Sequence, residues 1–252
     1  MKGLKGKIAI VTASTAGIGL SIARRLAEEG ATVVVSSRKR ESVDAAVKQI
    51  SVEGFSAYGI TCHVGKAESR KALIEDTIAK FGRIDILVSN AAANPTYGPI
   101  IETDEATWDK VFDVNVKGAF LLAADVARIM AKQTSGSIVF VSSVAGYQPM
   151  PNLGVYSVSK TALLGLMQTL AAEWASLGIR VNAVAPGMVK TKFSEALWKN
   201  PKIEKKMTEA IPLRRFGLPD EIASAVCFLV SDEASYVHGE TMIVSGGLAA
   251  RL

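Results

Sequence analysis

Short apolar runs alternate with longer stretches that carry apolar residues at helical spacing, and this pattern continues along nearly the whole chain. A short apolar run bounded by turn residues is typical of a strand buried on both faces of a parallel sheet. The expected strands lie at 7–12, 32–37, 57–64, 84–89, 137–142, 180–185 and 241–245, and the expected helices at 18–29, from about 41, 66–81, 104–132, 154–177 and 220–230. This alternation predicts an α/β fold with one doubly wound, parallel, seven-stranded sheet in a single domain over 1–252. Residues 188–207 break the rhythm and predict an insertion that covers the site.

Composition excludes several classes of protein. The chain has 252 residues, 49% of them hydrophobic, which is enough for one sizeable core. No apolar run approaches the roughly 18–20 residues that span a membrane, and the first apolar stretch is too short for a secretory signal. Cys62 and Cys227 offer neither a disulfide framework nor zinc-ligand spacing, so no metal is expected. The net charge of +5 is scattered and lacks interleaved aromatic residues, so no nucleic acid is expected.

A glycine-containing turn follows the first expected strand and leads into a helix. Gly17 and Gly19 would let the backbone approach a pyrophosphate at the helix N-terminus, where unpaired N–H groups favour anions. Strand, glycine turn and helix in this order are the context of a dinucleotide-binding loop in a Rossmann fold. The usual first glycine is replaced by Ala13, which is still small enough for the turn to form. The expected cofactor contacts of this loop are Ala13, Ser14, Thr15, Gly17, Ile18 and Gly19.

The second expected strand ends in Ser37 and two cations, Arg38 and Lys39. In a Rossmann unit an acidic residue at this point binds the 2′-hydroxyl of NAD, whereas an arginine accommodates the 2′-phosphate of NADP. No acidic residue stands here, and a guanidinium can hold a phosphate through two parallel hydrogen bonds. Basic residues also oppose the dipole at a helix start, which argues against a purely structural role. The expected cofactor is therefore NADPH/NADP, with these three residues near its phosphate.

Tyr156 and Lys160 stand four residues apart near the start of an expected helix. Side chains at this spacing share one helix face. A free phenol has a pKa of ~10 and exchanges protons poorly near neutral pH. A lysine ammonium beside it favours the phenolate, so Lys160 is expected to lower the pKa of Tyr156 towards the working range. The pair predicts a tyrosine that exchanges a proton with a substrate.

Taken together, these features resemble the short-chain dehydrogenase/reductase family over nearly the whole chain. The residues that carry the resemblance are Thr12 with the turn glycines, Asn90-Ala91, Asn115, Ser143, Tyr156, Lys160 and Pro186-Gly187 with Thr191. Ser143 precedes the tyrosine by the family's usual interval, so Ser142 is the less suitable serine. The segments around His63, Asn90 and Tyr156, with the final Arg251-Leu252, resemble a narrower group of peroxisomal NADPH-dependent retinal and carbonyl reductases.

The resemblance implies reduction of a carbonyl compound to an alcohol. Tyr156 would be the general acid, and Lys160 would lower its pKa and hold the nicotinamide ribose. Ser143 would hydrogen-bond the substrate oxygen as charge develops there. Asn115 would hold a water that links the lysine to solvent. The family also implies a homotetramer.

Further binding residues follow from the same resemblance. His63 stands where the family commonly has an aspartate on the adenine amine, so adenine contacts are expected from the backbone and Val64. The other implied cofactor contacts are Asn90, Ala91, Ala92, Pro186, Gly187, Val189 and Thr191. The insertion places apolar side chains near Ser143 and Tyr156, and a bulky hydrophobic carbonyl substrate is expected to contact Met188, Phe193, Leu197 and Trp198.

Two other functions remain open at this point. One is a 3-oxoacyl-carrier-protein reductase of the same fold, which shares the catalytic residues and the preference for NADPH. The other is a non-catalytic dinucleotide-binding or nucleic-acid-binding protein, which would have no need of Tyr156 and Lys160.

The chain ends in Ala250-Arg251-Leu252, which is similar to the Ser-Lys-Leu address read by the peroxisomal import receptor. The tripeptide follows Gly246-Gly247, just past the last expected strand, where termini tend to be exposed. Peroxisomal localisation is therefore expected, and a cytoplasmic one if the tripeptide is not read.

Overall fold

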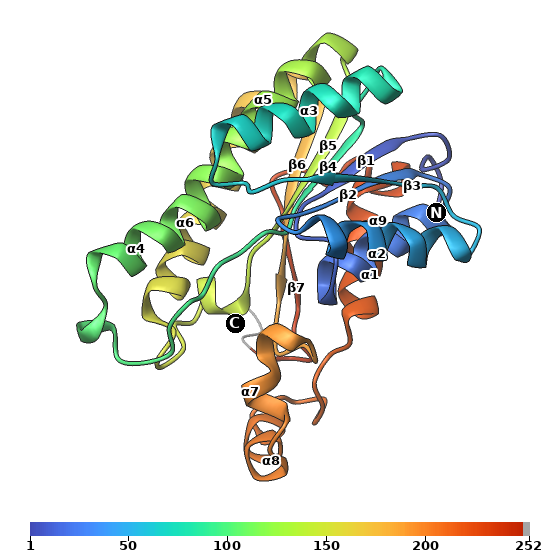
Figure 1. Cartoon of the computed structure of the whole chain (residues 1–252). Coiled ribbons are helices and arrows are strands. Elements are labelled where there is room, and N and C mark those ends of the chain that lie inside the picture. Colours follow the sequence, from blue (N-terminus) through green and yellow to red (C-terminus); the bar gives the residue numbers. More distant parts are fainter. Residues whose placement is uncertain (249–252) are drawn as a thin grey trace.

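Seven parallel strands form one sheet in the order β3-β2-β1-β4-β5-β6-β7 in the computed structural model, which describes residues 1–248 (Figure 1). The expected doubly wound fold is therefore confirmed. The strands are β1 (Ile8–Val11), β2 (Thr32–Ser37), β3 (Ala57–Thr61), β4 (Ile86–Ser89), β5 (Gly136–Val141), β6 (Ile179–Pro186) and β7 (Thr241–Val244). Because β1 pairs with both β2 and β4, the chain reverses its direction across the sheet at this point, and a crevice opens at the carboxyl ends of these strands.

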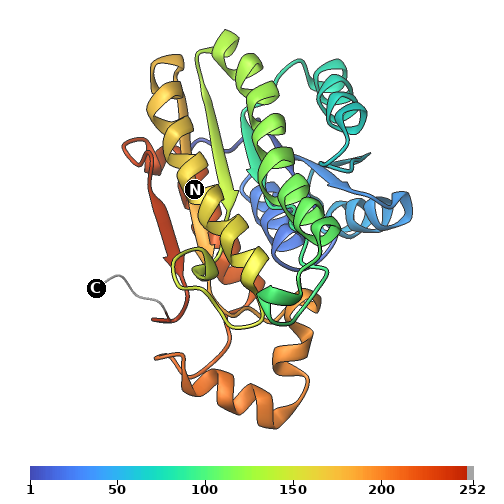
Figure 2. The same cartoon turned by 90° about the vertical axis from the view of Figure 1, so that its left-hand side faces the viewer.

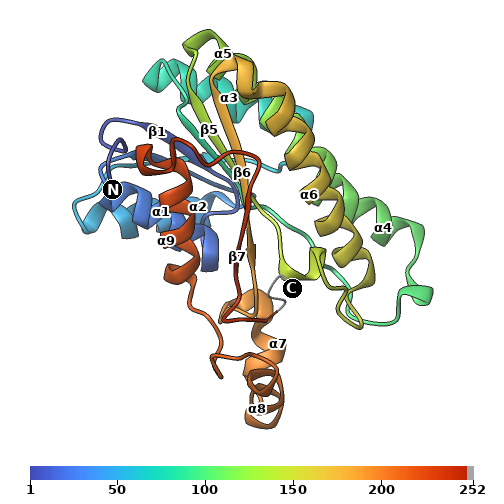
Figure 3. The same ribbon diagram turned by 180° about the vertical axis from the view of Figure 1, so that it is seen from behind.

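Helices cover both faces of the sheet, as the opposite views in Figures 1 and 3 show. They are α1 (Gly17–Glu28), α2 (Arg40–Val52), α3 (Ala67–Phe81), α4 (Glu105–Phe112), α5 (Ala119–Gln133), α6 (Gly154–Trp174), α7 (Glu195–Trp198), α8 (Pro201–Glu209) and α9 (Pro219–Val230). One face packs on α1, α2 and α9 through a buried cluster that contains Leu26 and Val226. The other face packs on α3, α5 and α6 through a second cluster that contains Leu122 and Met167. Within residues 1–248, no helix combines the length and apolarity needed to cross a bilayer.

Two expected elements differ from the structure. β3 ends at Thr61, short of residue 64, because the chain turns where His63 accepts hydrogen bonds from the backbone of Gly65 and Lys66. The helix expected at 104–132 is interrupted between α4 and α5 by a π-helical turn, Asp113–Gly118. Tight packing accompanies this turn, since a Cβ on Gly118 would lie 2.8 Å from the carbonyl oxygen of Val64.

The insertion after β6 forms a separate lobe at the carboxyl edge of the sheet (Figure 2). A short turn, Lys192–Ser194, precedes α7 and α8, and the lobe runs to Glu209, slightly beyond the expected 188–207. Two backbone hydrogen bonds of 2.9 Å hold the base of the lobe. The N–H of Gly217 donates to the carbonyl oxygen of Met188, and the N–H of Lys190 donates to the carbonyl oxygen of Gly217. The C-terminal tripeptide expected to act as an address lies outside the described residues.

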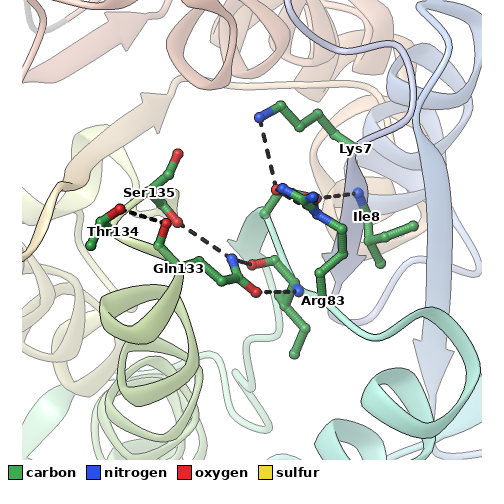
Figure 4. A network of polar contacts seen from close by, with 8 residues as sticks. Lys7, Ile8, Arg83, Gln133, Thr134 and Ser135 are labelled. Carbon is green, nitrogen blue, oxygen red and sulfur yellow. Dashed lines mark hydrogen bonds and ion pairs between the residues drawn. The ribbon is translucent and has the colours of Figure 1, made fainter.

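A polar network closes the opposite edge of the sheet, at the amino ends of β1 and β4 (Figure 4). The buried carboxylate of Asp85 accepts a hydrogen bond from the backbone of Ile8 at 2.9 Å and is paired with Arg83. Nearby, the Gln133 side chain binds both backbone groups of Ile84, at 3.1 and 2.8 Å. These contacts join β1, β4 and the end of α5 and close the amino edge of the sheet. The crevice that can bind a ligand therefore lies at the carboxyl edge.

Candidate active site

A cavity of about 290 Å³ lies at the carboxyl edge, between the glycine turn, the start of α6 and the lobe. The sequence-predicted residues that line it are Ala13, Gly17, Ile18, Gly19, Asn90, Ala92, Ser143, Tyr156, Lys160, Pro186, Gly187, Met188, Val189, Thr191, Phe193 and Leu197. The fold therefore brings together most of the residues that the sequence analysis selected from segments far apart in the chain. The lining also contains residues that the sequence analysis did not select, among them Met150 and Leu153, which belong to an irregular loop without periodicity.

Lys160 is almost completely buried in this cavity, with 2% of its surface exposed. Its Nζ donates a hydrogen bond to the carbonyl oxygen of Val141 at 2.8 Å and lies 5.5 Å from the centre of the Tyr156 ring. The two side chains share one face of α6, as their spacing predicts. Burial disfavours the charged amine and lowers the pKa of Lys160 to about 8.

The phenol of Tyr156 has a raised pKa, not the lowered one expected from the sequence. Burial raises the pKa of Tyr156 to about 12, and the hydrogen bond with Ser143 offsets part of that effect. The expectation fails because desolvation penalises the phenolate and also penalises the lysine charge that was to stabilise it. Tyr156 therefore keeps its proton throughout the neutral range and can donate it.

Ser143 is held at the end of β5 by the turn that follows. Its Oγ accepts a hydrogen bond from the backbone N–H of Ala145 at 3.1 Å and remains beside the phenol of Tyr156. Ser142 has a different task, because its buried hydroxyl donates to the carbonyl oxygen of Lys160 at 3.0 Å. Of the two serines, Ser143 is therefore the one whose hydroxyl can reach a substrate oxygen.

Asn115 lies in the π-helical turn and is 1% exposed. Its Oδ1 accepts from the backbone N–H of Ala93 at 2.7 Å, and its Nδ2 donates to the Ala93 carbonyl and to the Ser159 hydroxyl, each at 3.0 Å. Ser159 in turn donates to the carbonyl oxygen of Tyr156 at 2.7 Å. The asparagine thus positions the start of α6 against the loop after β4. Ser159, which the sequence analysis passed over, is the link.

The glycine turn fits a pyrophosphate group. α1 begins at Gly17 without a side-chain cap and without an acidic residue in its first turn, so its N-terminal N–H groups face the cavity. Gly19 is required because a Cβ there would lie 2.4 Å from the carbonyl oxygen of Ala13. Thr12 and Asn90 fix the turn to β4, since the threonine Oγ1 accepts from the Asn90 backbone at 2.9 Å.

Two residues selected in this turn, Ser14 and Thr15, do not line this cavity. The buried hydroxyl of Ser14 bridges β1 and β2 by donating to Val11 at 2.6 Å and accepting from the backbone of Ser36 at 2.9 Å. Thr15 is half-buried and also lies outside the cavity lining. Ser14 therefore supports the conformation of the glycine turn through its contacts with β1 and β2 and does not face the cavity.

Ala13 adopts a left-handed conformation with a φ of 50°, where a side chain is strained. Ala13→Gly should relieve this strain, and we expect a gain in unfolding free energy of about 0.5–1 kcal/mol after the added flexibility of the unfolded chain is counted. Urea denaturation checks the result, with Ala23→Gly inside α1 as the control, which should lose about 1 kcal/mol. A loss of stability in both variants would contradict the strain at residue 13.

A second cavity of about 650 Å³ adjoins the first and crosses the ends of β2 and β3. Its lining includes Ala13, Ser37, Arg38, His63, Val64, Ala91 and Ala92. Arg38 and Lys39 are exposed and have no salt bridge within residues 1–248, whereas Arg40 is paired with Asp44 at 2.9 Å. Unpaired cations at this position fit a phosphate group at the end of β2.

The lobe presents an apolar wall to the phenol. The Phe193 ring is 62% exposed, and its centre lies 6.1 Å from that of Tyr156. Trp198 does not line the cavity, because its indole N–H donates to the carbonyl oxygen of Thr191 at 3.0 Å and braces the lobe from within. The structure therefore gives this indole a structural role, and the substrate contact expected for Trp198 stays a prediction.

Comparison with known proteins agrees with this arrangement. A family model described as Enoyl-(Acyl carrier protein) reductase matches residues 12–249. The pig (Sus scrofa) protein Dehydrogenase/reductase SDR family member 4 is 53% identical over 251 residues, covering 100% of this chain and 90% of the relative. The human (Homo sapiens) protein of that name is 52% identical over 249 residues, covering 99% of this chain and 90% of the relative.

Solved structures are also similar over the full length. An actinorhodin polyketide ketoreductase variant with NADPH has a TM-score of 0.94 at 32% identity and covers 100% of both chains. A 3-ketoacyl-(acyl-carrier-protein) reductase from Brucella melitensis, complexed with NADH, has a TM-score of 0.92 at 29% identity, with 98% of this chain and 100% of that chain covered.

Proposed function

Because this chain belongs to the short-chain dehydrogenase/reductase family of oxidoreductases, we propose that it reduces bulky apolar carbonyl compounds to alcohols with NADPH. The observation that carries the proposal is the placement of the Tyr156 and Ser143 hydroxyls together in a cavity walled by apolar side chains. Retinal, aromatic ketones and dicarbonyls are the substrate classes that suit such a wall.

The chemistry divides between the cofactor and the side chains. A bound nicotinamide cofactor supplies the hydride that reaches the carbonyl carbon. Tyr156 donates its proton to the carbonyl oxygen, and its pKa of about 12 keeps that proton in place at neutral pH. Ser143 donates a hydrogen bond to the same oxygen and stabilises the charge that develops there. Lys160 keeps its amine beside the phenol, where it would also hold the ribose of a bound cofactor.

The test is NADPH oxidation followed at 340 nm against a panel of retinal, aromatic ketones, dicarbonyls, quinones and acetoacetyl thioesters. We expect the highest kcat/KM with the bulky apolar ketones and retinal. A strong preference for acetoacetyl thioesters, together with capture of acyl carrier protein, would instead establish the 3-oxoacyl-carrier-protein reductase function.

The preference for NADPH rests on Arg38. Arg38→Asp removes the phosphate partner and adds an acceptor for a ribose hydroxyl, so the NADPH-to-NADH ratio of kcat/KM should fall about tenfold or more. The matched control is Arg40→Asp, because Arg40 is already paired with Asp44 and should leave the ratio nearly unchanged. If both variants keep the wild-type ratio, the phosphate is held elsewhere.

We also propose that Ala250-Arg251-Leu252 directs import into peroxisomes, on the basis of its similarity to the Ser-Lys-Leu address. A fluorescent protein fused to the N-terminus should appear in puncta that contain a peroxisomal marker. Deletion of the tripeptide should make the fluorescence diffuse, and puncta that survive the deletion would refute the proposal.

A further inference from the structure

The wider cavity indicates where the base of a dinucleotide lies. If the pyrophosphate lies at the start of α1 and the 2′-phosphate at Arg38, the ribose between them lies over the end of β2. The base then extends one strand farther out, over the turn after β3, because β3 is the neighbour of β2. That turn consists of His63, Val64 and Gly65, all of which line the cavity. This placement rests on the proposed NADPH-dependent function.

His63 lines this cavity, and one of its two ring nitrogens already takes part in a hydrogen bond within the protein. Its Nδ1 accepts a hydrogen bond from the backbone N–H of Gly65 at 3.1 Å. The ring lies against that glycine, since a Cβ there would be 3.1 Å from the Cε1 of His63. A ring nitrogen that accepts a hydrogen bond carries no proton, so the proton of the neutral imidazole is on Nε2. The free side of His63 is therefore a donor and cannot accept.

A donor selects different atoms of the base than a carboxylate would. A carboxylate accepts a hydrogen bond from the 6-amino group of adenine, whereas an N–H group needs an unprotonated ring nitrogen such as N7. We propose that His63 reads the base through an acceptor atom, so that the 6-amino group of adenine is not required for binding. This property would separate the chain from a reductase that carries an aspartate at the same position.

Other polar side chains reach the cavity from α4 and the turn after it, namely Asp109, Lys110 and Asp113. Asp113 is paired with Lys117 at 3.0 Å. Asp109 has no salt bridge within residues 1–248, which makes its carboxylate the competing acceptor for the 6-amino group. The two groups predict opposite responses when the amino group is removed.

The experiment compares NADPH with its hypoxanthine analogue, which has a carbonyl oxygen in place of the 6-amino group. Calorimetric titration gives both Kd values without any turnover, and kcat/KM is measured in parallel. If His63 is the reader, the two Kd values should agree within about threefold, because the carbonyl oxygen and N7 both accept from Nε2–H. An analogue that binds more than about tenfold weaker than NADPH would overturn the inference and leave the proposed function intact. Failure of NADPH itself to bind would refute the proposed function.

Variants identify the group responsible. His63→Asp converts the donor to an acceptor and should make the analogue bind about tenfold weaker than NADPH, since two oxygens would then face each other. His63→Asn is the control, because an amide can donate or accept and should tolerate both bases. Asp109→Asn should leave the base preference unchanged. If the ratio of the two Kd values changes in Asp109→Asn but not in His63→Asp, Asp109 and not His63 is the residue that recognises the base.

Discussion

Tyr156→Phe is expected to lower kcat for carbonyl reduction by about 10²–10⁴-fold, which is the usual value of a positioned general acid. The phenol hydroxyl is the group placed to donate the proton, and Ser143 cannot replace it because an aliphatic hydroxyl is a weaker acid. Removal of one oxygen leaves the ring packed beside Phe193, so the cavity keeps its shape. The Kd for NADPH should therefore stay within about threefold of the wild-type value.

Two measurements separate this role from a structural one. Single-turnover kinetics should show that the chemical step is slowed, while thermal unfolding is unchanged. The matched control is Tyr147→Phe, because Tyr147 lies just before α6 but outside the cavity, and its variant should keep nearly full activity. Retention of more than about a tenth of the wild-type kcat in Tyr156→Phe would remove this residue from the role of acid.

Lys160→Met is expected to lose activity and to gain stability. Activity should fall by about 10²-fold or more, because the variant loses the amine that neighbours the phenol and that we propose orients the ribose. The pKa of the buried amine is about 8, against an ordinary value of 10.5. Below pH 8 the folded protein therefore bears the full cost of a buried charge, and the unfolded chain does not. The gap between the two pKa values corresponds to about 3 kcal/mol, of which the lost hydrogen bond to Val141 offsets about 1 kcal/mol.

The sign of this effect can be tested with pH. Between about pH 8 and 10.5 the unfolded chain binds more protons at this site than the folded protein, so wild-type stability gains as pH rises. Lys160→Met lacks this gain, and its advantage of about 2 kcal/mol at pH 7 should shrink as pH approaches 10. Denaturation curves at pH 7, 8.5 and 10 measure the difference. An advantage that is constant across this range would contradict the lowered pKa.

Local patterns in the sequence were enough to predict the architecture and the family. Apolar runs placed all seven strands, and the spacing of Tyr156 and Lys160 placed both side chains on one helix face. The resemblance to short-chain dehydrogenases/reductases is confirmed by the relatives and the family model. These features depend on neighbouring residues or on motif spacing, both of which can be read without the fold.

Features that depend on distant contacts could not be predicted in the same way. The break at Asn115 involves hydrogen bonds to Ala93 and Ser159, which lie far from it in the chain. The shift in the pKa of Tyr156 has the opposite direction from the expectation because burial outweighs the hydrogen bond with Ser143, and burial is a property of the folded core. Trp198 is a large apolar residue of the kind expected to contact an apolar substrate, but its indole N–H donates a hydrogen bond to the carbonyl oxygen of Thr191.

The π-helical turn at Asp113–Gly118 also sets the helical phase between α4 and α5. A π-helical turn contains one more residue than an α-helical path between the same two points, so deletion of one residue there can be absorbed by a return to α-helical geometry. Successive residues of a regular α-helix are about 100° apart around the axis, so the same deletion inside α5 would rotate the residues that follow by that angle and turn the fully buried Leu122 and Val126 away from the sheet. Single-residue deletions should therefore be better tolerated within 113–118 than within the first turn of α5.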